Sequence, residues 1–343
     1  MTYAEAMVVG LIQGVTELFP VSSLGHNVLI PALIGGSWAQ DLSVSAPESP
    51  YLAFIVGLHV ATAAALIVYF WRDWVRLVGG FISSVRERRI ATADQRLAWM
   101  IILATIPVGI AGLLLEHAFR VYFSKPIPTA IFLAVNGVIL LGGERAVRLR
   151  TRPLAAPAGE PARPVGPQAE QPDGPTARSA EAAEAAAPAV AAETAVAVEP
   201  ARERETTRAI AADRRLSLMG YGKALLIGSA QIAALLPGIS RDGIVTVTGM
   251  LRGVPREDAV RFSFLLSTPV ILAAGVLKVP DLTGSLGNGI RGQVLVGSLL
   301  SFVGAYLSVR FLTRYFAKDR PLTPFGIYCL LAGLGSLAYL LAR

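Results

Sequence analysis

The chain has 343 residues, of which 53% are hydrophobic and only 16% charged, and its mean hydropathy is +0.55. Since soluble domains carry about 25% charged residues, this composition excludes a single water-soluble globule. Residues 153–207 hold nine acidic and four basic residues, so the other 288 residues carry a net charge of +12. A strongly apolar and basic chain is typical of a membrane protein with arginine-rich cytoplasmic loops, and without a polar basic face we expect no binding to nucleic acid.

The first predicted element, residues 5–35, is an apolar segment that is interrupted near its middle. The interruption consists of Glu17, Pro20, Ser22, Ser23 and His26. Non-helical backbone at membrane depth has to be buried in protein or line a wet cavity. We therefore predict a half-helix, a turn and a second half-helix that together form a re-entrant hairpin.

Six apolar runs are predicted to cross the bilayer as helices, which takes about 20 residues each. The first three follow the hairpin directly, and the last three close the chain. A second interrupted segment, residues 220–252, precedes the last three and predicts a second re-entrant hairpin. The six runs are 51–71, 97–115, 127–143, 259–278, 292–309 and 322–342, and the second interruption consists of Pro237, Gly238, Ser240, Arg241 and Asp242.

The order of these elements predicts an all-α polytopic membrane protein with an inverted-topology repeat, made of six transmembrane helices and two re-entrant helical hairpins. Its two halves are residues 1–150 and 209–343. An odd number of crossings separates the hairpins, so they would enter from opposite faces and meet near the midplane. Basic residues in 72–96, in 145–152 and in 314–320 place those three loops in the cytoplasm.

Between the two halves, residues 151–208 are predicted to be a disordered cytoplasmic linker without a catalytic part. Residues 153–207 contain 18 alanines and nine prolines, but no aromatic residue. Such a composition buries too little apolar surface to offset the entropy of an ordered chain.

The first hairpin carries residues that could perform acid–base chemistry. Gln13 and Glu17 are four residues apart and would share one helix face. An ionisable group inside a membrane segment indicates function by default, although a structural ion pair is the alternative for Glu17. Ser23 is placed to cap the second half-helix, with His26 at its third position, where an imidazole near Glu17 could transfer protons. Capping alone would also explain Ser23.

The second hairpin offers a site for an anion. Ser240 can cap a helix whose free N–H groups attract anions, and Arg241 adds a planar fork that fits phosphate. If the hairpins meet, Arg241 and two helix N-termini would surround a point faced by Glu17. The alternative is that Arg241 extends to the interface. Gln231 occupies a place like that of Gln13, and His59 is expected to bond to another helix.

Two motifs resemble signatures of the bacterial undecaprenyl-diphosphate phosphatase (bacitracin-resistance) family. The first runs from Gln13 through Glu17, Pro20-Val-Ser-Ser23 and Leu-Gly-His26. The second runs from Gln231 through Pro237-Gly-Ile-Ser240 to Arg241, and Arg261-Phe-Ser-Phe-Leu-Leu-Ser follows as in family members. The likeness covers both halves and excludes only the linker.

This resemblance implies an enzyme of the bacterial inner membrane that hydrolyses undecaprenyl diphosphate to the monophosphate. Such an enzyme recycles the carrier lipid of cell-wall synthesis at the outer face, confers bacitracin resistance, and depends on a divalent cation, Mg²⁺ or Ca²⁺. The resemblance assigns catalysis to Glu17, Ser23, His26 and Arg241. The nucleophile stays open between Ser23, His26 and water. Substrate-binding residues would be Gln13, Ser22, Gln231, Gly238, Ser240 and Arg241.

The chain departs from the family's motifs in both turns. Leu24 replaces a threonine in the first turn. In the second, Asp242 replaces a serine, and Ile244 and Val245 replace an alanine and a threonine. Asp242 could offset the charge of Arg241 or join Glu17 in holding the cation. A polyprenyl-phosphate flippase and a catalytically divergent relative are the alternative functions. A homodimer is left open.

Overall fold

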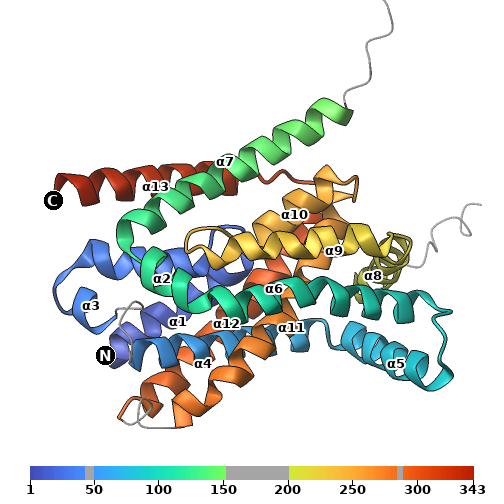
Figure 1. Cartoon of the computed structure of the whole chain (residues 1–343), viewed down its shortest axis with the longest axis horizontal. Coiled ribbons are helices and arrows are strands. Elements are labelled where there is room, and N and C mark those ends of the chain that lie inside the picture. Colours follow the sequence, from blue (N-terminus) through green and yellow to red (C-terminus); the bar gives the residue numbers. More distant parts are fainter. Residues whose placement is uncertain (43–49, 152–200, 284–288) are drawn as a thin grey trace, which may run out of the picture.

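The structure is a computed structural model that describes residues 1–42, 50–151, 201–283 and 289–343. Within these ranges the chain is helical and contains no strand. Short turns join most of the helices, so the chain folds back on itself repeatedly (Figure 1). The first half of the chain forms α1 (Tyr3–Leu18), α2 (Ser23–Ile34), α3 (Gly36–Asp41), α4 (Pro50–Tyr69), α5 (Trp71–Glu87), α6 (Ala93–Phe123) and α7 (Pro126–Thr151).

The second half contains a 3₁₀ helix as well as α-helices. Its elements are α8 (Ala201–Ser217), α9 (Tyr221–Ser229), the 3₁₀ helix η1 (Ala230–Leu235), α10 (Arg241–Leu251), α11 (Arg256–Thr283), α12 (Arg291–Phe316) and α13 (Thr323–Ala342).

Five of the described helices are long and apolar enough to cross a membrane on their own, namely α6, α7, α11, α12 and α13. Two further spans are reached if bent pairs are counted: α4 with α5, bent by 87°, and α8 with α9 and η1, bent by 104°. The six predicted apolar runs coincide with helices, although the run 51–71 passes the end of α4 and crosses the bend at Phe70. The described residues therefore form only helices and turns, and the chain is a polytopic membrane protein.

Both interrupted segments are broken helices. The break in the first lies between α1 and α2, where Ser22 has a positive φ of 69°. The break in the second lies between η1 and α10, where Gly238 has a φ of 112°. A serine in this region of φ is uncommon, and it persists only where surrounding contacts hold it in place.

Two stretches between the predicted elements differ from expectation. The loop predicted over 72–96 contains α5, a helix with one buried face, because its apolar residues repeat with helical spacing. The linker predicted over 151–208 is helical at both edges, since Thr151 ends α7 and α8 begins at Ala201. The remainder of that linker, 152–200, lies outside the described residues.

Small residues let the helices approach closely, as is common between helices in membranes. A Cβ atom added to Gly14 on α1 would overlap the backbone of Ser301 on α12. A Cβ atom on Gly333 of α13 would overlap the backbone of Ala134 on α7, and Figure 1 shows these two helices side by side. These contacts fix the position of α1, which ends at the first break, and of α7, which lies against both breaks.

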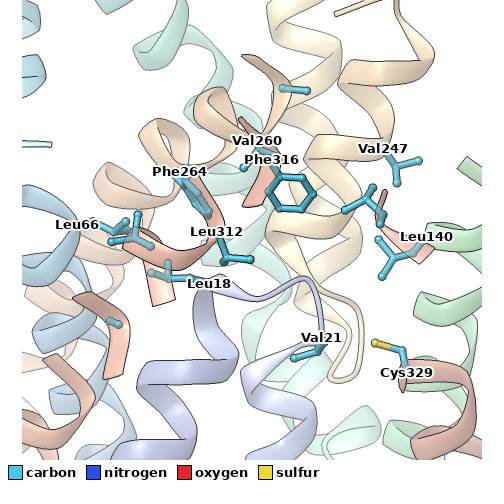
Figure 2. Close-up of a cluster of buried hydrophobic side chains, with 14 of the residues drawn as sticks. Leu18, Val21, Leu66, Leu140, Val247, Val260, Phe264, Leu312, Phe316 and Cys329 are labelled. Carbon is cyan, nitrogen blue, oxygen red and sulfur yellow. The ribbon is translucent and has the colours of Figure 1, made fainter. Parts of the chain in front are cut away.

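One buried apolar cluster joins residues from both halves of the chain (Figure 2). Leu18 and Val21 enter it from the first break, and Leu312 and Phe316 enter it from α12. Lipid tails are as apolar as these side chains, so close van der Waals packing in this cluster, and not removal from water, holds the first break against the second half of the protein.

Candidate active site

The two breaks lie directly against each other, although more than 200 residues separate them. The Ser22 hydroxyl accepts hydrogen bonds from the N–H of Gly25, at 3.3 Å, and from the N–H of Gly238 in the other break, at 3.1 Å. A Cβ atom on Gly25 would lie 3.0 Å from the Cα of Gly238, which leaves little room for a side chain between the turns. The predicted meeting of the two motifs is thus present.

Asn136, at the centre of α7, bridges the two breaks from the side. Its amide nitrogen donates to the Pro20 carbonyl at 3.0 Å, and its amide oxygen accepts from the Ser240 N–H at 3.0 Å. The side chain is fully buried. A buried amide that satisfies backbone groups of both turns fixes their relative position.

Glu17 is the centre of the site. Its buried carboxylate accepts hydrogen bonds from the Ser23 hydroxyl, from the Arg241 guanidinium and from the Gln13 amide, the last at 2.8 Å. Glu17 lies in the last turn of α1, Ser23 begins α2 and Arg241 begins α10. Three of the predicted catalytic residues therefore meet within hydrogen-bonding distance.

Ser23 does not cap α2, contrary to the prediction. Ser22 is the capping residue, because its positive φ turns its hydroxyl toward the Gly25 N–H. Ser23 is then the first helical residue, and its hydroxyl is free to point at Glu17. His26 accordingly stands one position later in the helix than expected.

The buried His26 side chain contacts α13 rather than Glu17. Its Nδ1 lies 2.7 Å from the Ser22 carbonyl oxygen and its Nε2 lies 2.7 Å from the Tyr328 hydroxyl. The rings of His26 and Tyr328 stack with their centroids 5.7 Å apart. The expected proximity of His26 to Glu17 is therefore not a direct contact in this structure.

A different histidine stands beside Glu17. The Nε2 atom of His59, on α4, lies 3.4 Å from a Glu17 carboxylate oxygen and 3.3 Å from the Gln13 amide nitrogen. Asn27 completes this chain of contacts by donating to the Gln13 amide oxygen at 2.5 Å. The sequence shows this histidine in the middle of an apolar run, but nothing in the sequence indicates that it lies beside Glu17.

Asp242 does not pair with Glu17. One of its carboxylate oxygens accepts from the hydroxyls of Ser263, at 2.5 Å, and Ser267, at 2.7 Å, both on α11. Its other oxygen is buried and has no hydrogen-bond partner within the described structure. The two serines lie in the stretch that begins at Arg261 and follows the second motif, so the sequence carried this signal as well.

The remaining predicted residues occupy the second break. Ser240 caps α10 by accepting from the Gly243 N–H at 3.1 Å. Gly238 packs against α7, where a Cβ atom would overlap the backbone of Leu133. Gln231 is buried in η1 and donates to the Gly228 carbonyl, while its amide oxygen has no hydrogen-bond partner among the described residues. These three residues therefore shape the second break, and the hydrogen-bond donors to Glu17 come from the first motif and from Arg241.

The donor set does not fit a preformed cation site. Both oxygens of Glu17 already accept hydrogen bonds, one of them from the positive Arg241, and one oxygen of Asp242 accepts from serines of α11, which leaves a single carboxylate oxygen of the two acids without a donor in the described structure. Hard cations such as Mg²⁺ prefer several oxygen ligands. Among the described residues no group of three acidic, histidine or cysteine side chains could hold a metal ion.

The chemical meaning of the site follows from its charges. An arginine fork and two helix N-termini, those of α2 and α10, provide attraction for an anion. A buried carboxylate bonded to a serine hydroxyl provides a proton acceptor next to a nucleophile. This combination is suited to the transfer of an acyl or phosphoryl group from an anionic substrate.

Comparison with known proteins decides between these classes. The family model described as "Bacitracin resistance protein BacA" matches residues 6–159 and 181–335. This chain belongs to the BacA family. It is 56% identical, over 100% of its length and 99% of the relative's, to the undecaprenyl-diphosphatase of Mycolicibacterium paratuberculosis.

Other members of the family are similar over nearly their whole length. The chain is 53% identical to undecaprenyl-diphosphatase 1 of Frankia casuarinae, over 97% of this chain and 96% of the relative. It is 36% identical to undecaprenyl-diphosphatase 2 of Chromobacterium violaceum, over 99% of each. The resemblance predicted from the two motifs is confirmed, and it extends across both halves of the protein.

Proposed function

We propose that this protein hydrolyses undecaprenyl diphosphate to undecaprenyl phosphate and inorganic phosphate. Such a reaction would recycle the cell-wall carrier lipid and confer resistance to bacitracin. The observation that carries the proposal is the joining of Glu17, Ser23 and Arg241 across two breaks of the chain in a member of the BacA family. The proposed location is the bacterial inner membrane.

In the proposed complex, Arg241 holds the diphosphate. Its guanidinium already spans from α10 to Glu17, and its Nε atom is buried without a hydrogen-bond partner in the described structure. That unused donor and the N-terminus of α10 favour a phosphate oxygen at this point. The apolar helices around the breaks would accommodate the prenyl tail.

Ser23 is our choice of nucleophile. Its hydroxyl donates to Glu17, so the carboxylate is placed to take the proton as the serine oxygen attacks the terminal phosphorus. A new Ser23–phosphorus bond forms, the bond to the bridging oxygen breaks, and undecaprenyl phosphate leaves. Water then cleaves the phosphoserine and releases phosphate. His26 as nucleophile and direct attack by water are the competing routes.

The predicted dependence on a divalent cation stays a proposal, and no step of this mechanism uses the ion. Both Glu17 oxygens and one Asp242 oxygen accept from protein donors, so a cation would find only the other Asp242 oxygen without a donor and would take most of its ligands from the diphosphate and solvent. Phosphate release measured in chelator, with Mg²⁺ and with Ca²⁺, tests the dependence. Equal rates in all three would contradict it.

The experiment that tests the function is phosphate release from undecaprenyl diphosphate by the purified protein in detergent. We expect activity in the wild type and its loss in Glu17→Ala, Ser23→Ala and Arg241→Ala, with Arg252→Gln, an exposed charge change on the C-terminal side of α10, as the control. A phosphoenzyme trapped on Ser23 would support the serine route. Translocation of the lipid without any phosphate release would contradict the proposal.

We further propose the finer topology: six spans, two re-entrant hairpins of residues 5–35 and 220–252, and an inverted relation between residues 1–150 and 209–343. The opposed breaks at Ser22 and Gly238 support it. Cysteine labelling at Ser45 should report the outside and at Ala187 the inside, and both positions lie outside the described residues. The reverse pattern would overturn the orientation.

A further inference from the structure

Helix α5 carries an apolar stripe that no part of the described structure covers. Five side chains at helical spacing form it, and each is at least half exposed: Trp71, Val75, Val78, Ile82 and Val85. The opposite side of the helix is the one that packs, since Leu77 and Ser84 are buried and Ser84 accepts a hydrogen bond from Trp99 of α6. The stripe is therefore the outward face of a helix whose opposite face packs against α6.

The length of α4 places this stripe at the membrane surface. α4 has 20 residues, and a helix of that length covers about 30 Å, the thickness of the hydrocarbon core. The chain has therefore crossed the bilayer by Phe70, where it bends by 87° into α5. A helix at right angles to a span lies along the bilayer surface and does not continue across it.

Ion pairs fix the bend. Arg76 of α5 donates to Asp94 at 3.0 Å and to Asp213 of α8 at 2.7 Å. Phe70, at the bend, is buried against Phe264 of α11. The angle between α4 and α5 is thus set by contacts with three other helices.

Positive charge runs along the edge of the stripe. Arg72 and Arg86 are exposed beside it, and Arg88 and Arg89 are exposed just after the helix, whereas Glu87 is the one exposed acid between Phe70 and Arg89. A cavity of about 520 Å³ opens at the bend and is lined by Arg72, Arg208 and Lys318 among others. An apolar stripe edged by arginines is complementary to anionic phospholipids and not to a second copy of itself.

We propose that α5 is an in-plane helix that binds anionic phospholipids, with its apolar stripe among the acyl chains and Arg72 and Arg86 at the headgroup phosphates. The phospholipids that would bind here share a phosphate ester attached to a diacyl tail. The protein thereby gains a lipid-selective surface separate from the Glu17 site, and α4 alone forms the span that precedes it.

The test uses the full-length protein in nanodiscs, with a fluorescent probe on Ile82→Cys; the native Cys329 is fully buried. Quenching by brominated phosphatidylglycerol is compared with quenching by brominated phosphatidylcholine, and aqueous iodide reports exposure to water. Glu87→Cys, on the polar side of α5, is the matched control. We expect the Ile82 probe to be shielded from iodide and quenched more by the anionic lipid, and the Glu87 probe to be open to iodide.

Replacing Arg72 and Arg86 by glutamine should reduce the preference for the anionic lipid by about fivefold for each arginine, from about 1 kcal/mol per basic residue near an anionic surface. Arg252→Gln, which removes the same charge outside α5, should leave the preference unchanged. Equal iodide quenching at Ile82 and Glu87 would overturn the proposal. So would a shielded Ile82 probe that neither lipid quenches, since a second copy or residues 152–200 would then cover the stripe.

Discussion

The ion pair between Arg241 and Glu17 gives the sharpest test of the site. The side chains of Arg241 and Glu17 are only 17% and 4% exposed, so water does little to replace the pair once it is broken. A hydrogen bond to a charged group contributes about 1.5–3 kcal/mol, which corresponds to about 10- to 150-fold in rate if it is needed in the transition state. We expect Arg241→Gln to lower kcat/KM for undecaprenyl diphosphate within that range.

Two further variants separate charge from geometry. Arg241→Lys keeps the positive charge but loses the planar fork, so its kcat/KM should lie between those of the wild type and Arg241→Gln. The double variant Glu17→Gln with Arg241→Gln should cost less than the sum of the two single effects, because the ion pair is lost in each single variant, whereas the roles of Glu17 as base and of Arg241 as phosphate ligand are lost separately. Phosphate release by equal amounts of folded protein is the assay. Additive losses, or an Arg241→Gln variant within about threefold of wild type where about tenfold or more is expected, would refute the reasoning.

Three other predictions concern the support of the site. Asn136→Ala removes the bridge between Pro20 and Ser240 and leaves buried backbone groups unpaired. The free energy of unfolding should fall by about 1–3 kcal/mol, measured by thermal unfolding in detergent, and an unchanged Tm would contradict this. Gly14→Ala should prevent α1 from packing on α12, seen as a poor yield of folded protein, whereas Gly109→Ala, where a Cβ meets nothing, should be tolerated. His59→Phe removes a polar neighbour of Glu17 and should lower the rate of phosphate release about tenfold, and His59→Gln should retain part of that rate. Full activity in His59→Phe would exclude a role for this side chain.

Much of the fold is predictable because its signals are local. The long apolar runs form helices, and proline, glycine and serine mark the breaks, because helix formation and its interruption depend on neighbouring residues. The likeness of two short motifs is enough to indicate the BacA family, which the full-length comparisons confirm.

Prediction is weaker where a pattern has two interpretations. The charge of residues 72–96 predicts a loop, although the apolar residues of α5 repeat as in a helix, because an amphipathic helix is polar on average. The pattern also favours Ser23 over Ser22 as the cap of α2, because the actual choice depends on a positive φ that serine rarely adopts.

Glu17, Ser23, His26 and Arg241 are rare polar groups in apolar segments, and this rarity identifies them in the sequence as residues that could do chemistry. Which of them meet depends on how the helices pack. In the folded protein Arg241 and His59 lie beside Glu17, and His26 contacts Tyr328. Asp242 accepts hydrogen bonds from serines of α11. These pairings join residues that are between 21 and 302 positions apart and depend on helix directions and close backbone approaches, which no local pattern specifies.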